Sequence, residues 1–259
     1  ERPLEAPDEF YVGYLPSAPP GLARVLRRTV ALLLAGVGLL ALGLAIAQSR
    51  ADARVFEFGE THELIGRIEA GALPMLVVPR PGSDGGVSRY VLVGAGKHGA
   101  QPLVSAFDGS LVSLRASLIY SGDQTLLELV PDSLRALSGA GTSPPSDSTA
   151  LGRFALRGEI VDSKCHFGVM NPGEGKPHRA CAVRCISGGE PPVLRVRAAD
   201  GRAHYFYLIG EDGREIGREL LDFVAEPVEI TGRVERRDSL YVLRTEPAAI
   251  RRLEQGTAP

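Results

Sequence analysis

The sequence predicts a mainly β protein that carries one apolar helix near its N-terminus, and three observations lead to that prediction. Residues 29–47 contain no charged side chain, much of the remaining chain is an internal repeat of strand-like segments, and one copy of the repeat carries a long insertion with all three cysteines. The formal net charge of −2 gives no general attraction to nucleic acid or to anionic lipid. The chain length suits two modest domains.

Residues 1–28 form a polar, proline-rich leader ahead of the apolar run. Such a composition favours a disordered tail. The aromatic side chains Phe10, Tyr11 and Tyr14 suggest an alternative, in which the leader binds a partner protein or lies among lipid headgroups.

Residues 29–48 are predicted to cross a lipid bilayer as a single transmembrane helix, because about 20 apolar residues span the hydrocarbon core. Three arginines precede this segment, at positions 24, 27 and 28, which favours a cytoplasmic N-terminus and places the rest of the chain in the periplasm. A cleaved signal peptide ending at Ala45-Ile-Ala47 is the competing interpretation. We favour a retained anchor, because the leader is long for the charged start of a signal peptide.

The internal repeat relates residues 90–137 to the segment 116 positions later. The shift places Gly94 on Gly210 and Pro131 on Pro247, together with a series of apolar pairs. Upstream, Gly66 matches Gly158, and Pro74 matches Pro192. The separation is 74 − 66 = 8 positions in the first copy and 192 − 158 = 34 in the second, so the second copy has 34 − 8 = 26 extra residues.

Each copy is predicted to be a five-stranded barrel. The first copy occupies residues 55–137 and the second residues 151–254. Alternating apolar residues predict three strands, a short helix and two more strands in each copy, with the helices at 101–107 and 215–224. That order is typical of the OB fold, so we expect two tandem OB-like barrels; a pair of small β-sandwiches is the alternative. Residues 138–150 are predicted to be a linker from their Ser, Gly and Pro content.

Two features suggest nucleotide or nucleic-acid binding, and neither is in the right context. The motif GAGKHG at 94–99 matches G-x-G-x-x-G, but no long helix of a βαβ unit follows it, so turn glycines are favoured. The aromatic run 205–207 resembles a base-stacking strand, but successive strand residues face opposite ways and no basic groove accompanies them. We therefore expect no nucleic-acid partner.

The insertion, residues 162–192, carries the chemistry-bearing side chains of the sequence. Its candidate metal ligands are Cys165, His166, His178, Cys181 and Cys185. The last two lie four positions apart and share a face if ACAVRC is helical. Thiolates with imidazole suit copper(I) or zinc.

Two other roles for the cysteines stay open. A disulfide from Cys165 to Cys181 or Cys185 would fix a loop rich in Gly and Pro, and would contribute about 3 kcal/mol. We favour this disulfide over a metal site, given an oxidising compartment. A redox-active thiol is the remaining possibility. No familiar hydrolase motif occurs in the sequence.

The run from 158 to 194, with DSKC, H-x-x-C-A and C-I-x-G-G-x-P-P, resembles uncharacterised bacterial membrane-anchored periplasmic proteins with OB-like domains and a cysteine-bearing loop. The leader DEFYVGYLPSAPPGLARVLRR followed by an apolar run is similar to that of uncharacterised bacterial inner-membrane proteins. The resemblance implies the fold and an inner-membrane location, and implies no activity.

The functional expectation is a non-catalytic accessory or assembly subunit of a membrane protein complex of the redox or electron-transport kind. Its partners would be other subunits of that complex, and it would carry no cofactor. The alternative is a periplasmic delivery protein that binds copper or zinc through the insertion, and a third hypothesis is a thiol oxidoreductase.

Overall fold

This computed structural model describes residues 18–49, 54–80, 86–139 and 148–253. The leader residues Phe10, Tyr11 and Tyr14 lie outside the described residues, so their predicted contacts stay predictions. Most of the predicted linker, 140–147, lies outside them as well. Residues 53–259 form one compact unit and the segment before them forms another.

The first unit contains helix α1 (Pro20–Ser49), which begins nine residues before the predicted transmembrane segment. Residues Pro20–Ala47 are long and apolar enough to cross a membrane, with a mean hydropathy of 2.6 in the most apolar window. A signal sequence near an N-terminus meets the same criteria.

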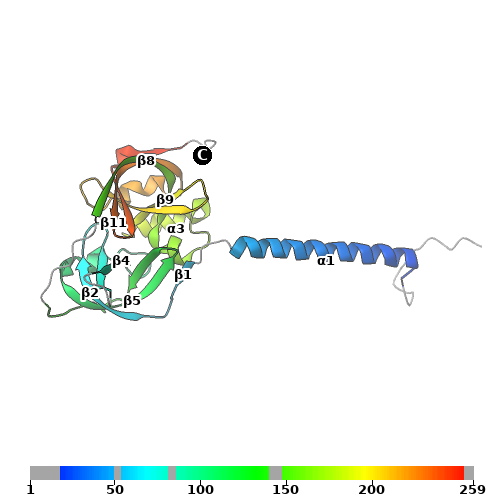
Figure 1. Ribbon diagram of the computed structural model, residues 1–259, viewed down its shortest axis with the longest axis horizontal. Coiled ribbons are helices and arrows are strands. Elements are labelled where there is room, and N and C mark those ends of the chain that lie inside the picture. The colour runs from blue at the N-terminus through cyan, green and yellow to red at the C-terminus, as the bar shows by residue number, and fades with distance from the viewer. Residues whose placement is uncertain (1–17, 50–53, 81–85, 140–147, 254–259) are drawn as a thin grey trace, which may run out of the picture. The chain divides into compact units, whose positions relative to one another are not determined.

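The second unit contains two closed five-stranded barrels, which confirms the predicted fold class (Figure 1). Barrel 1 is built from β2 (His62–Glu69), β3 (Met75–Pro79), β4 (Val87–Val93), β5 (Leu111–Ser121) and β6 (Gln124–Leu129). Barrel 2 is built from β8 (Ser148–Asp162), β9 (Pro192–Arg197), β10 (Ala203–Gly210), β11 (Pro227–Arg237) and β12 (Leu240–Thr245). Each closes through one parallel pair, β4 with β6 and β10 with β12, and both have the OB-like order.

Short elements complete the second unit. Strands β1 (Arg54–Phe56) and β7 (Arg135–Ala136) pair with β5, and β13 (Ile250–Arg252) pairs with β11. The helical segments predicted between the third and fourth strands are α2 (Gln101–Val104) with η1 (Ser105–Phe107) in barrel 1, and the 3-10 helix η3 (Gly217–Phe223) in barrel 2. A further 3-10 turn, η4 (Pro247–Ala249), precedes β13. Strand β8 begins at Ser148, inside the predicted linker, because its first residues pair with the end of β11.

The strand registers repeat between the barrels. Leu92 pairs with Leu127 in barrel 1, and Leu208 pairs with Leu243 in barrel 2, each 116 positions later. Gly66 and Gly158 occupy equivalent places where a Cβ would lie 2.5 and 2.2 Å from a carbonyl oxygen of the neighbouring strand. Only glycine tolerates that approach, which explains why both copies have it.

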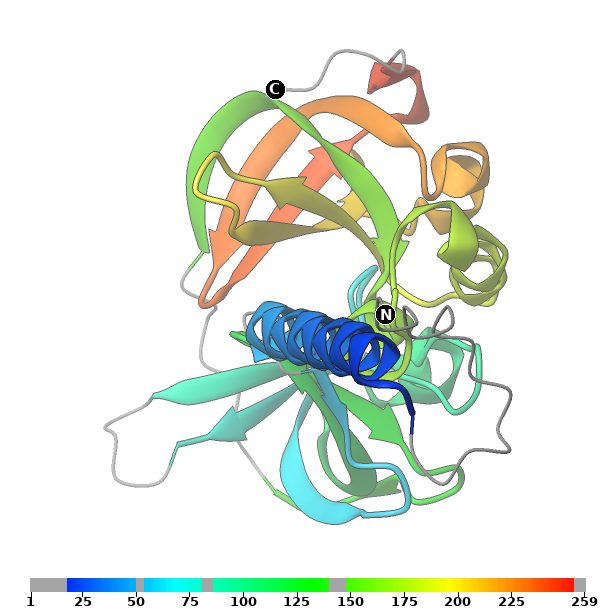
Figure 2. The same ribbon diagram turned by 90° about the vertical axis from the view of Figure 1, so that its right-hand side faces the viewer.

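An apolar cluster joins the two barrels, in addition to the separate core inside each barrel. Buried residues from both barrels contact one another in a single cluster that includes Val91, Leu126, Val193 and Val242. Phe167 of the insertion lies in the same cluster and is fully buried. Arg89 of barrel 1 also binds Asp238 of barrel 2 at 2.6 Å. Figure 2 shows the barrels one above the other in the second unit.

Candidate functional site

The insertion, residues 162–192, folds into two short helices at the junction of the barrels (Figure 1). The π-helical turn η2 (Cys165–Val169) follows β8, and helix α3 (Gly175–Ser187) precedes β9. The sequence predicted only a helical turn around ACAVRC. Helix α3 extends over thirteen residues, and Pro177 does not interrupt it because it lies in the first turn, where proline is tolerated. The helix ends at Ser187, Gly188 is its C-cap, and Gly189 follows with a φ of +95°, which suits the end of a helix.

The three cysteines meet where η2 faces α3. The Sγ atom of Cys165 lies 3.8 Å from that of Cys181 and 3.7 Å from that of Cys185. All three Sγ atoms are within 4.8 Å of one another. Cys165 and Cys185 are buried, whereas Cys181 is half-buried. We refer to these three sulfurs as the thiol cluster.

The predicted disulfide is not formed in this structure, where all three cysteines are free. A disulfide needs a sulfur–sulfur distance of about 2.05 Å. Cys165 instead lies at nearly equal distances from two sulfurs, so neither is singled out as its partner. Three of the five predicted metal ligands, Cys165, Cys181 and Cys185, therefore lie together.

Lys97, from the loop after β4, brings a positive charge to the thiol cluster. Its Nζ atom lies 2.8 Å from the Sγ atom of Cys181 and 3.6 Å from that of Cys185. The hydrogen bond to Cys181 raises the pKa of the Lys97 ammonium above its ordinary value. A lysine held here favours the thiolate form of the sulfurs that it contacts.

The thiols of Cys165 and Cys185 form an unequal pair. A hydrogen bond to Cys185, followed by burial and the nearby Asp162 carboxylate, raises the pKa of Cys165. The same hydrogen bond lowers the pKa of Cys185 against the effect of burial, with Lys97 assisting. Cys165 therefore keeps its proton and donates it towards the Cys185 sulfur.

Asp162 and His178 lie next to the thiol cluster in the buried part of the site. The Nε2 atom of His178 lies 2.7 Å from Oδ1 of Asp162, and Oδ2 accepts the backbone N–H of Cys165 at 2.8 Å. Burial alone would raise the pKa of Asp162, but these hydrogen bonds outweigh it and lower the pKa. One ligand atom each from Asp162, Cys165 and His178 lies within 4.8 Å of the others.

His166, the other histidine predicted as a metal ligand, is directed elsewhere. Its Nδ1–H donates to the carbonyl oxygen of Gly173 at 2.9 Å, and its ring packs against Phe167 and Tyr205. Burial lowers the pKa of His166 to about 4, so the ring is neutral at physiological pH. Among the described residues, His166 belongs to no group of converging metal ligands.

The glycine motif at 94–99 supports the site rather than a nucleotide. A Cβ on Gly99 would lie 2.0 Å from the carbonyl oxygen of Gly189, and a Cβ on Gly188 would lie equally close to that of Lys97. Gly96 has a φ of +68°, as a turn glycine does. These close backbone approaches dock the loop of barrel 1 on the end of α3 and hold Lys97 over the sulfurs.

A buried lysine strengthens the same contact. The Nζ atom of Lys164 donates to the carbonyl oxygens of Gly94 at 2.7 Å and Gly96 at 2.6 Å, and it also binds Glu128. Glu190 lies 3.8 Å from it, and burial raises the pKa of that carboxyl well above its ordinary value.

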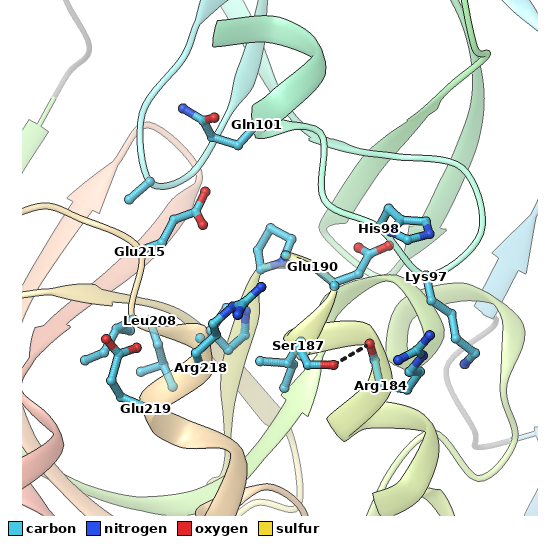
Figure 3. Close-up of a pocket in the computed structure, with 18 of the residues that line it drawn as sticks. Lys97, His98, Gln101, Arg184, Ser187, Glu190, Leu208, Glu215, Arg218 and Glu219 are labelled. Atoms are coloured by element: carbon cyan, nitrogen blue, oxygen red, sulfur yellow. Dashed lines mark hydrogen bonds between the residues drawn. The ribbon is translucent and has the colours of Figure 1, made fainter.

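Figure 3 shows a cleft whose wall includes Lys97, the lysine that contacts the thiol cluster; the cleft has a volume of about 820 Å³. Lys97 and His98 line it from barrel 1, Arg184 from α3, and Glu215 and Arg218 from barrel 2. Lys97 therefore belongs both to the cleft wall and to the half-buried side of the cluster. The residues that line the cleft include no cysteine, and Lys97 is the side chain that connects it with Cys181.

Sequence reasoning missed Lys97, Asp162 and Lys164. For Lys97 a signal existed, because Gly96 and Gly99 align with Asp212 and Glu215 in the second copy. Extra glycines in one copy of a repeat indicate a close backbone approach there. Asp162 and Lys164 carry no comparable signal.

No family model matches the chain, and no curated protein matches it significantly. Among solved structures, a deletion mutant of the single-stranded DNA binding protein from Thermus aquaticus is similar at 13% identity. The match covers 80% of this chain and 98% of that one, with a TM-score of 0.21. A TM-score that low carries no inference about this chain, so the OB-like assignment rests on its strand order.

Proposed function

We propose that this protein is a membrane-anchored carrier of a thiophilic metal ion, which it binds through Cys165, Cys181 and Cys185. The convergence of the three sulfurs carries the proposal. Zinc bound to thiolates at about 2.3 Å in tetrahedral geometry places neighbouring sulfurs about 3.8 Å apart. The distances from Cys165 to the two other sulfurs are 3.8 and 3.7 Å, so the cluster needs little rearrangement to bind an ion.

Charge also favours a bound cation. When all three cysteines bind an ion as thiolates, they and the Asp162 carboxylate carry four negative charges, and Lys97 is the cation that contacts the sulfurs. Uncompensated charge in a buried site is costly, so a divalent or monovalent metal ion stabilises the thiolate form. Lys97 takes part of that role when no ion is bound.

The partial exposure of Cys181 to solvent favours exchange of the ion. Cys181 is the least buried of the three cysteines, and it lies beside the cleft wall at Lys97. An ion can therefore enter or leave at Cys181 while Cys165 and Cys185 still hold it. A carrier must pass its ion to another protein, and a half-buried ligand leaves a side from which that protein can approach.

The location and the partners of the protein belong to the same proposal. Helix α1 would anchor the chain in a bacterial inner membrane, with both barrels in the periplasm. The role of an accessory or assembly subunit of a membrane complex, predicted from the sequence, is compatible with a carrier that delivers its ion to a neighbouring membrane protein. That role stays a prediction.

A thiol oxidoreductase is a second candidate, favoured by one contact. The Lys97 ammonium lies 2.8 Å from the Cys181 sulfur, and a nearby cation favours the nucleophilic thiolate. The metal carrier is preferred because it uses all three sulfurs.

The test is the native mass of the full chain, purified in detergent without chelator or reductant. We expect extra mass that matches one zinc or copper ion, lost in Cys165→Ser and in Cys185→Ser. The matched control is Ser187→Ala on the same helix, which should keep the ion. A wild-type mass two hydrogens below the reduced chain, with nothing bound, would refute the proposal and support the disulfide.

A further inference from the structure

His178 and Asp162 are buried next to the thiol cluster, and three thiolate ligands do not account for them. Both side chains are almost completely excluded from solvent. The Asp162 carboxylate accepts the Nε2–H of His178, which leaves the lone pair of Nδ1 free. Among the described residues, Nδ1 of His178 is buried without a hydrogen-bond partner. A buried polar atom without a partner requires an explanation, and a bound ion is one of the common ones.

The arrangement of His178 and Asp162 is that of a metal-binding histidine held by a carboxylate. A histidine that binds a metal donates its second ring N–H to a carboxylate in many sites, because the carboxylate fixes the ring and increases its basicity. The Asp162–His178 pair has this arrangement, and the second oxygen of Asp162 holds the backbone of Cys165. One carboxylate therefore positions both the histidine and the first cysteine of the cluster.

Helix α3 places His178 on the same face as two of the cysteines. His178, Cys181 and Cys185 occupy positions i, i+3 and i+7 of α3, which lie along one face of a helix. Cys165 approaches that face from η2. One ring nitrogen of His178 lies within 4.8 Å of the Cys165 sulfur. Coordination requires that the imidazole turns so that Nδ1 faces the sulfurs of Cys181 and Cys185.

We propose that His178, oriented by Asp162, is the fourth ligand of the site, and that the ion is zinc(II) in a tetrahedral Cys₃His arrangement. The proposal rests on the metal-binding function proposed above and adds the identity of the ion. Four ligands of sulfur and nitrogen suit tetrahedral zinc. Copper(I) is satisfied by the three sulfurs alone, so it would not depend on His178.

Cobalt(II) tests the fourth ligand, because its visible absorption reports tetrahedral geometry and thiolate bonds. The full-length protein in detergent is stripped of metal under anaerobic reducing conditions and titrated with cobalt(II). We expect the wild type to bind one ion with an intense tetrahedral spectrum. His178→Ala should lose that intensity and bind cobalt(II) and zinc(II) more weakly, by about 100-fold or more. Asp162→Asn should weaken binding by about 10- to 100-fold.

His178→Cys distinguishes a ligand from a merely structural histidine. A cysteine can replace imidazole as a fourth ligand but cannot replace its hydrogen bond to Asp162 with the same geometry. The variant should regain the tetrahedral spectrum with stronger thiolate-to-cobalt absorption. The exposed His204→Ala is the matched control and should match the wild type.

The outcomes separate the two proposals. Failure of the wild type to bind cobalt(II), zinc(II) or copper(I) would overturn the metal function itself. Binding to the wild type with an unchanged cobalt spectrum in His178→Ala would overturn only the fourth ligand. A folded His178→Cys protein that does not regain the tetrahedral spectrum would overturn it as well. Copper(I) affinity within about twofold of wild type in His178→Ala would support zinc as the ion that uses this histidine.

Discussion

The two barrels share strand order and register, yet they differ in the connection between their first two strands. In barrel 1 this connection is the short turn 70–74, which leads from β2 to β3. In barrel 2 the equivalent connection, from β8 to β9, contains η2, α3 and the thiol cluster. The difference indicates that the barrels act as a scaffold, and that the reactive side chains are concentrated in the one long connection.

Barrel 1 nevertheless takes part in the site. The loop after β4 supplies Lys97, and its glycines allow the loop to dock on the end of α3. The equivalent loop of barrel 2 has Asp212 and Glu215 at those glycine positions. The two copies therefore differ in complementary ways. Barrel 2 carries the cysteines, and barrel 1 carries the loop that packs against them.

The largest expected effect comes from removing the side chain that fixes the insertion between the barrels. Phe167 is fully buried and its ring lies 4.8 Å from that of Tyr205 in an edge-to-face contact. Phe167→Ala should lower the free energy of unfolding by about 3–5 kcal/mol, because it leaves a cavity in the shared core. Chemical denaturation measures this effect.

Phe58→Ala is the matched control for Phe167→Ala, since Phe58 is 84% exposed. It should change the free energy of unfolding by less than about 0.5 kcal/mol. Similar losses for both phenylalanines would contradict the view that the insertion is part of the core.

The second prediction concerns pH and the neutral His166. Its pKa is about 4 in the folded protein, against about 6.5 for an unfolded chain. The unfolded state therefore binds more protons between these values, and stability falls as pH decreases from about 6.5 to 4. The loss is at most about 3 kcal/mol from this group.

The slope of stability against pH measures the contribution of His166. His166→Asn keeps a donor for the carbonyl oxygen of Gly173 but cannot titrate, so it should flatten the curve below pH 6.5. His204→Asn removes an exposed histidine as the control. An equally steep curve in His166→Asn would assign the acid sensitivity to other groups.

The fold was predictable because it depends on the alternation of apolar and polar residues along each strand, and this pattern occurs in both copies of the repeat. The offset of 116 between the copies reappears in strand pairing, where Val112 pairs with Ala136 and Val228 with Arg252. Gly66 and Gly158 mark the same close approach in each barrel. Register follows from the apolar pattern of each copy, and two copies with the same pattern give two indications of the same register.

The site was only partly predictable. The sequence identified Cys165, Cys181, Cys185 and His178, because ligand residue types gather in one insertion. It could not show that His166 faces Tyr205 instead, since neighbouring residues of a short turn point in different directions. Lys97 reaches Cys181 across 84 positions of sequence, and such a contact has no local pattern.

The smallest of these effects tests the contact between the two copies at the glycine motif. A Cβ at Gly99 would lie 2.0 Å from the carbonyl oxygen of Gly189, so Gly99→Ala must separate the loop of barrel 1 from the end of α3. We expect a loss of about 1–3 kcal/mol in the free energy of unfolding. Because Lys97 moves with this loop, the affinity for the proposed zinc ion should change as well. Gly71→Ala is the control, because Gly71 lies in the short connection of barrel 1 with nothing within 4 Å of its added Cβ. Equal effects of the two substitutions would show that the motif is an ordinary turn, whereas a loss confined to Gly99→Ala would show that the loop of barrel 1 packs specifically against the end of α3.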